Sequence, residues 1–146
     1  QAANGSAGVS AQVKQVSGAI SYVEISYADA NRLNTVKLDT GAAQPVEATV
    51  ENASRAIAEA KIVGTGKDLA LDVAFDTKTE GAYPISLVTY EIVCDKGNNP
   101  ETLKSVKAFL NYTASEAGQK SIAGKGYAPI PDEVITKVRE VIPTLS

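Results

Sequence analysis

The sequence contains no His, no Met and no Trp, and it has a single Cys. His is the usual base that activates a Ser or Cys nucleophile and the commonest transition-metal ligand, so its absence argues against hydrolase and zinc sites. No Ser lies in a Gly-x-Ser-x-Gly turn, and the carboxylates of Asp72 and Asp76 are interpreted as solvated surface charge. We therefore predict that the chain is not an enzyme and holds no cofactor.

The sequence also lacks a basic stripe, a long apolar run and many aromatic residues. Its net charge is -3, and only 5% of its residues are aromatic, which predicts no nucleic-acid partner. No run approaches the length of a membrane span, and QAANGSAGVS lacks the basic and apolar regions of a signal peptide. Because there is no Met from which translation could begin, the chain is expected to be a fragment of a longer protein.

The single cysteine, Cys94, ends the apolar run SLVTYEIVC. Such a position predicts a buried, unpaired thiol that behaves as a small hydrophobe. The alternative is one half of a disulfide whose partner lies outside this sequence. A catalytic thiol has no His to activate it.

Helical patterns alternate with runs that favour strands. An apolar spacing between Ser6 and Gly18 predicts a first helix, and similar signals predict helices over residues 26–33, 46–63, 101–112, 113–126 and 131–142. Strand-like runs cover residues 19–25 and 35–39, with a brief one between Gly64 and Gly81. The β-rich run over residues 83–94 is apolar at both alternating sets of positions, so we predict an interior strand over residues 84–93. The class is therefore α/β.

Two Gly-Lys pairs invite a nucleotide-binding interpretation. They lie in the segments Gly64–Lys67 and Gly124–Gly126. A phosphate-binding loop needs a Gly five positions before its second Gly and a Ser or Thr after the Lys. Position 61 is Lys, position 119 is Gln, and neither pair has the hydroxyl residue. Both segments are therefore interpreted as turn or helix-end glycines.

Asn4, Gly5 and Ser6 form the one candidate ligand-binding segment. A Gly-rich turn that leads into a helix presents unpaired N–H groups, which can hold an anion. The alternative is an ordinary N-terminal cap of the first helix. We expect no metal site.

Three stretches, taken in order, resemble the phosphate-specific substrate-binding proteins of bacterial ABC importers. They are NGSAGVSAQVKQVSGAISYVEISYA, AYPISLVTYEIVCDK and KAFLNYTASEAGQKSIAGKGYAPIPDEVITKV. GAISYVEISYA is similar to the family's Gly-Ala-Ile-Gly-Tyr-Val-Glu segment, and YAPIPDEVITKV is similar to its terminal Tyr-x-Pro-Leu-Pro helix. Ser21 replaces a Gly that is frequent in the family.

The resemblance implies the C-terminal part of an α/β periplasmic-binding-protein fold of type II. Residues 1–81 would belong to the second lobe, and residues 82–146 would be the returning part of the first lobe. Inorganic phosphate would lie between the lobes, held largely by upstream elements: Ser and Thr loops, an Asp, and an Arg near a Ser-Gly-Thr turn. The implied partner is an ABC permease. The implied location is extracytoplasmic, periplasmic or at the cell surface, with any lipid anchor N-terminal to this chain.

Two further functions stay open at this point. A protein of the same fold could bind another oxyanion. This alternative would be supported if the upstream part of the protein lacked the Arg and Asp elements. A cell-surface interaction or adhesion domain would instead be a stable folded monomer with a sizeable exposed patch.

Overall fold

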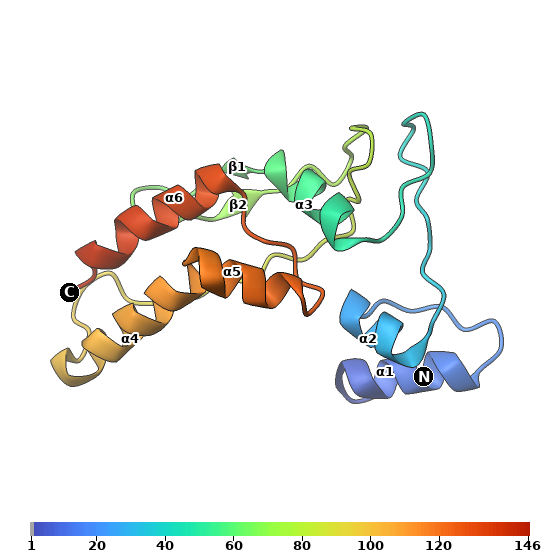
Figure 1. Ribbon diagram of the computed structural model, residues 1–146, viewed down its shortest axis with the longest axis horizontal. Helices are drawn as coiled ribbons and strands as arrows, with labels where there is room; N and C mark the ends of the chain where they lie inside the picture. The colour runs from blue at the N-terminus through green and yellow to red at the C-terminus, as the bar shows by residue number, and fades with distance from the viewer. Residues whose placement is uncertain (1) are drawn as a thin grey trace.

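The computed structural model describes residues 2–146, and helices dominate them (Figure 1). A short 3-10 helix, η1 (Ile142–Thr144), follows the last α-helix. In chain order the other elements are α1 (Gly5–Gln15), α2 (Ile25–Asn31), α3 (Val50–Ala58), β1 (Lys61–Ile62), β2 (Leu71–Asp72), α4 (Pro100–Thr113), α5 (Glu116–Ala123) and α6 (Asp132–Val141).

The C-terminal helices begin where their cap residues predict. Asn99 precedes Pro100 and accepts a hydrogen bond from the Glu101 N–H at 2.9 Å, which satisfies one of the free donors of α4. The Ser115 hydroxyl accepts from the Gly118 N–H at 3.0 Å at the start of α5. These local bonds agree with the helices predicted over residues 101–112 and 113–126, and α6 covers most of the helix predicted over residues 131–142 without a side-chain cap.

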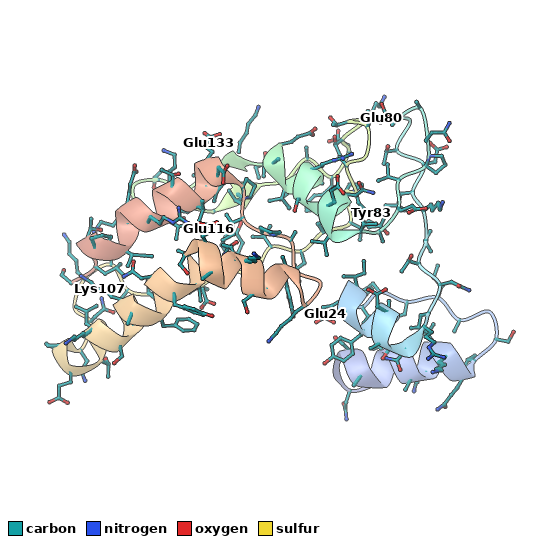
Figure 2. All side chains as sticks on the ribbon, in the orientation of Figure 1. Glu24, Glu80, Tyr83, Lys107, Glu116 and Glu133 are labelled. Atoms are coloured by element: carbon teal, nitrogen blue, oxygen red, sulfur yellow. The ribbon has the colours of Figure 1, made fainter. Side chains whose placement is uncertain are left out.

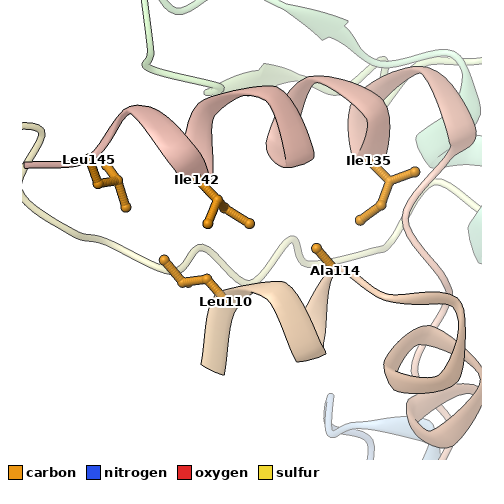
Figure 3. Close-up of a cluster of buried hydrophobic side chains, with 5 residues drawn as sticks. All are labelled: Leu110, Ala114, Ile135, Ile142 and Leu145. Carbon is orange, nitrogen blue, oxygen red and sulfur yellow. The ribbon is translucent and has the colours of Figure 1, made fainter. Parts of the chain in front are cut away.

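The main apolar cluster lies between α4 and the α6–η1 segment (Figure 3). α4 contributes Leu110, which is only 7% exposed, and Ala114 follows at the end of the helix. Ile135, Ile142 and Leu145 cover them from the other side, and half-buried residues of the same stripes pack around the cluster: Leu103, Val106, Val138 and Val141. The helices predicted over residues 101–112 and 131–142 therefore pack against each other through their apolar residues.

The long helix predicted over residues 46–63 is shorter than expected at both ends. Thr49 caps α3 by accepting from the Asn52 N–H, so the helix begins at Val50. Val46 is buried and instead exchanges backbone hydrogen bonds with Leu38. Lys61 and Ile62 leave the helical pattern and pair antiparallel with Leu71 and Asp72 as the β1–β2 ladder.

Most of the predicted strands do not form. Residues 19–24 form no strand or bridge, and of residues 35–39 only Leu38 forms a bridge. The interior strand predicted over residues 84–93 is wrong for this structure, because within residues 2–146 no strand pairs with this segment and Leu87 is 94% exposed. A strand is stabilised by hydrogen bonds to a neighbouring strand, and within residues 2–146 this segment has no such neighbour.

Cys94 is also placed differently from the prediction. It is a free cysteine, as predicted, but it is exposed rather than buried. Its position at the end of the uncovered segment explains the difference, since the apolar residues before it are not enclosed either.

Backbone bonds tie the end of this segment to the last residue of the chain. The Ser146 N–H donates to the Asp95 carbonyl at 3.1 Å, and the Asn98 N–H donates to the Ser146 carbonyl at 3.1 Å. The Lys67 amine pairs with the Asp95 carboxylate and donates to the Thr144 carbonyl. Three distant parts of the sequence therefore meet beside α6. No helix among residues 2–146 is both long and apolar enough to cross a membrane.

Candidate functional site

The candidate anion-binding segment lies at the N-terminus of α1. Asn4 is the N-cap residue in an extended conformation, and its side chain makes no capping hydrogen bond. Gly5 adopts a φ of +61°, a left-handed conformation that costs glycine less than any other residue. The Ser6 and Ala7 N–H groups donate to no backbone carbonyl within the described residues. The structure therefore brings Asn4, Gly5 and Ser6 together at a helix end with free donors.

A carboxylate already faces this helix end. The nearby Ser6 side chain, and after it the backbone of Glu24 itself, act as hydrogen-bond donors that lower the pKa of the Glu24 carboxyl below its usual range. Glu24 immediately precedes α2, and Figure 2 labels it at the start of that helix. An anion at Asn4, Gly5 and Ser6 would have to approach this negative charge.

The first two helices hold the candidate segment against Glu24. Ser10 of α1 is fully buried, and its hydroxyl accepts a hydrogen bond from the Asn31 side-chain amide of α2 at 3.2 Å. The Ser10 hydroxyl in turn donates to the Ala7 carbonyl at 3.1 Å. This polar contact joins the two helices. Asn4 and Gly5 themselves are exposed, so an anion there would keep much of its water.

A cavity of about 580 Å³ lies at the end of α3, β1 and the start of α6. Its charged lining residues are two carboxylates and two amines, namely Glu59, Glu133, Lys61 and Lys137. Hydrogen bonds from the Thr79 and Thr77 hydroxyls lower the pKa of the Glu59 carboxyl; the Thr77 bond is 2.7 Å long. Because the opposite charges balance, this lining favours neither anions nor cations. The cavity is lined by residues 58–69, which precede the lobe boundary predicted near Gly81, and by residues of α6, which follow that boundary.

The two Gly-Lys segments serve structural roles, as interpreted from the sequence. A Cβ at Gly64 would lie 2.1 Å from the Asp68 carbonyl oxygen, so this turn leaves no space for a side chain. Lys67, the neighbouring amine, is paired with Asp95. Gly124 is the C-cap residue of α5. Among residues 2–146, no group of three or more potential ligand side chains is placed to hold a metal ion.

The role of Glu24 could not be found from the sequence. Eighteen positions separate it from Ser6, and the two meet only because α1 and α2 pack together. Helical and strand periodicity predict neighbours only within one element, so neither predicts that Ser6 and Glu24 lie close together. The candidate segment itself was detectable, because Gly before a helix is a local signal.

A family profile described as a PBP superfamily domain matches residues 1–117. The match covers well over half of the chain. This chain belongs to the PBP superfamily. The mixed helices and few strands of the structure agree with the predicted α/β class of such a domain.

Curated relatives of this PBP superfamily chain are named as phosphate-binding proteins. Phosphate-binding protein PstS 3 of Mycobacterium leprae is 42% identical over 135 residues, which is 90% of this chain and 36% of that protein. PstS 2 of Mycobacterium tuberculosis is 38% identical over 99% of this chain and 40% of its own length. PstS of Haemophilus influenzae is 31% identical over 95% of this chain and 41% of its own length.

The PBP superfamily chain therefore spans about two fifths of the length of the curated relatives that it matches. No solved structure matches it. The larger part of each relative has no counterpart among these 146 residues, so residues of a complete ligand site can lie outside them.

Proposed function

We propose that this chain is part of a protein that captures inorganic phosphate outside the cytoplasmic membrane and delivers it to an ABC permease without transforming it. The observation that carries the proposal is the similarity to phosphate-binding proteins over 90% to 99% of the chain. The relatives are named for binding rather than for a reaction, and they support neither an adhesion domain nor an enzyme. The permease and the extracytoplasmic location follow from the family resemblance.

The 146 residues hold at most a small part of the phosphate site. A charge-assisted hydrogen bond contributes about 1.5–3 kcal/mol, so an enclosed phosphate needs several converging donors. The α1 N-terminus offers an exposed helix end, worth about 0.3–1 kcal/mol, and Glu24 opposes an anion there. Most phosphate ligands therefore come from the part of the protein that this chain does not span.

The lobe assignment belongs to the same proposal. Residues 1–81 are assigned to the second lobe and residues 82–146 to the returning part of the first lobe, in line with the resemblance. Closure of two lobes around phosphate would exclude water and strengthen each donor. Any lipid anchor would lie N-terminal to this chain.

Calorimetric titration with inorganic phosphate tests the proposal. The full-length gene product should bind phosphate with micromolar or tighter affinity, and the 146-residue chain should show no binding in the same buffer. Sulfate serves as the matched oxyanion control. If the full-length protein bound sulfate more tightly than phosphate, the assigned ligand would be another oxyanion. If it bound neither anion, the proposal would be rejected.

Micromolar phosphate binding by the 146-residue chain would show that the site has been misplaced. Ser6→Ala and Glu24→Gln would then separate two explanations. If the α1 N-terminus is the site, Ser6→Ala weakens phosphate binding and Glu24→Gln strengthens it, because that change removes an opposing charge.

A further inference from the structure

Asn4 is the only asparagine of the sequence that is followed by a glycine. In an Asn-Gly pair the backbone nitrogen of the glycine can attack the side-chain amide carbon of the asparagine, because glycine has no Cβ to hinder the approach. The attack forms a cyclic succinimide and breaks the bond to the amide nitrogen, which leaves as ammonia. Water then opens the ring at either carbonyl and leaves aspartate or isoaspartate. The net change is the addition of water and the loss of ammonia, without any other reactant.

The structure leaves both reacting groups of this pair accessible. Asn4 is exposed, and its side chain makes no capping hydrogen bond although it is the N-cap residue of α1. Gly5 is exposed as well, and among the described residues its N–H donates to no carbonyl. Neither the attacking nitrogen nor the amide that it attacks must therefore give up a hydrogen bond before they react.

One backbone bond holds Asn4 in its present conformation. The attack needs a rotation about the Asn4 ψ angle, now 114°, that brings the Gly5 nitrogen to the side-chain amide. Within residues 2–146, the only backbone hydrogen bond of Asn4 is the one that its carbonyl accepts from the Gly8 N–H at 3.2 Å. Bonds in the first turn of a helix open at a small cost in free energy. The reactive conformation is therefore reached without unfolding the rest of the chain.

Most of the other asparagines are held by hydrogen bonds. The side-chain amides of Asn31, Asn52 and Asn98 each donate to a backbone carbonyl. The Asn99 side chain caps α4, and the residue after it, Pro100, has no N–H that could attack. The fold therefore protects these four side chains from the reaction.

Two asparagines remain for comparison with Asn4. Asn111 lies inside α4, where the helix fixes its backbone. Asn34 is exposed and makes no side-chain hydrogen bond among the described residues, so it resembles Asn4 in its surroundings. It is followed by Thr35, whose β-branched side chain crowds the attacking nitrogen. Asn34 is therefore the internal control for the effect of the glycine.

We propose that Asn4 is a site of spontaneous deamidation. The modification adds one negative charge, at the end of α1 where unpaired N–H groups favour a carboxylate. In isoaspartate the side-chain carbon becomes part of the backbone, which lengthens the chain between residues 4 and 5. This product would move the residue 4 carbonyl away from the Gly8 N–H and loosen the first turn of α1. The proposal is independent of phosphate binding.

Mass spectrometry of peptides from the full-length gene product tests the proposal. The protein is incubated at mildly alkaline pH, and the replacement of the amide by a heavier acid group is followed at each asparagine. Asn4 should deamidate at least about tenfold faster than Asn34, which corresponds to about 1.4 kcal/mol in activation free energy. Fragmentation should identify both aspartate and isoaspartate at position 4. A rate at Asn34 that equals or exceeds the rate at Asn4 would overturn the proposal.

The unfolded protein supplies a second measurement of the effect of the fold. In guanidinium chloride Asn4 should react no more than about tenfold faster than in the native protein, because the native state opens easily there. Asn52, whose amide is bonded to the Glu47 carbonyl at 3.0 Å, should gain far more from unfolding. If unfolding accelerated Asn4 as much as Asn52, the native structure would protect Asn4 and the proposal would fail.

A matched pair of glycine variants tests the role of Gly5. Gly5→Ala should slow deamidation of Asn4 at least about tenfold, a change of about 1.4 kcal/mol in activation free energy. The difference should persist in guanidinium chloride, where an altered helix end cannot explain it. Gly18→Ala is the control, since Gly18 also has a positive φ and open space around it but lies beyond the other end of α1. An unchanged rate at Asn4 in Gly5→Ala would contradict attack by the Gly5 nitrogen.

Discussion

The α4–α6 region and residues 84–93 are neighbours in the sequence, and both are rich in apolar residues. α4 buries Leu110 against Ile142, whereas Leu87 in the extended segment meets almost no other side chain. A helix satisfies its backbone groups within itself, so two amphipathic helices need only each other's apolar stripes. A strand must find its hydrogen-bond partners elsewhere in the sequence.

The difference teaches that the same apolar content has different consequences in the two regions. In the helical region the apolar stripes of α4 and of the α6–η1 segment bury one another. In the extended segment the large apolar side chains stay exposed within residues 2–146. Each of the following predictions separates the two regions or tests a contact that distinguishes them.

The largest effect is expected from shortening one leucine in each region of the 146-residue chain. Leu110→Ala leaves a cavity in the α4–α6 cluster and should lower the free energy of unfolding by about 2–5 kcal/mol. Leu87→Ala, the matched control, should change it by less than about 0.5 kcal/mol because the side chain is exposed in both states. Urea unfolding followed by circular dichroism measures both values. Equal losses would remove the distinction between the two regions.

A smaller effect is expected at the helix caps. Asn99→Ala removes the hydrogen bond to the Glu101 N–H and should lower the free energy of unfolding by about 1 kcal/mol. Asn4→Ala is the control, because Asn4 occupies the same position of α1 without a side-chain capping bond. Its effect should be a few tenths of a kcal/mol at most. A larger loss of unfolding free energy for Asn4→Ala in the same assay would mean that the Asn4 side chain makes a stabilising contact that the structure does not contain.

A still smaller effect concerns Glu24. Its lowered pKa means that the Ser6 contact stabilises the fold at pH values above the ordinary pKa of the carboxyl, and that this contribution is lost as the pH falls through the lowered value. Ser6→Ala should raise the pKa of Glu24 toward the ordinary value in an NMR titration of its side chain. Ser17→Ala, a serine beyond the other end of α1, serves as the control. An unchanged pKa in Ser6→Ala would exclude the contact.

The smallest difference is expected for the thiol of Cys94. Because this cysteine is free and exposed, a thiol reagent should label the native 146-residue chain nearly as fast as the urea-unfolded chain. The thiol reagent releases a chromophore as it reacts, and the absorbance of that chromophore gives the labelling rates of the native and unfolded chains at one pH. Labelling that is slower by orders of magnitude in the native chain would instead indicate the buried Cys94 thiol that was expected from the sequence.

The helices were predictable from the sequence because their signals are local. The Asn99–Pro100 start of α4 and the apolar spacing of α6 each lie within a few turns of the residues that they organise. α3 was predicted too long at its start, since apolar spacing continues through Val46 although Val46 pairs with Leu38, which lies outside the helix. Errors therefore begin where a residue's partner lies outside its own helical turn.

The extended segment and the candidate site show the same limit. The β-rich pattern of residues 84–93 states correctly that both faces are apolar, but a pattern does not say whether the partner strands belong to the same 146 residues. The free helix end at Gly5 was visible as a local signal. The Glu24 carboxylate opposite it was not, because the packing of α1 on α2 brings it there.

The bonds between Asn98 and Ser146 have a consequence for the order of folding. The Asn98 side chain donates to the Ser146 carbonyl across 48 positions, in addition to the bond from its backbone N–H. Helices form on a timescale of about a microsecond, whereas closing a long loop must first overcome its entropy. α4, α5 and α6 have 14, 8 and 10 residues, lengths at which an isolated helix is marginal in water. The packing of α4 against the α6–η1 segment is therefore expected to stabilise these helices and close this loop in the same step.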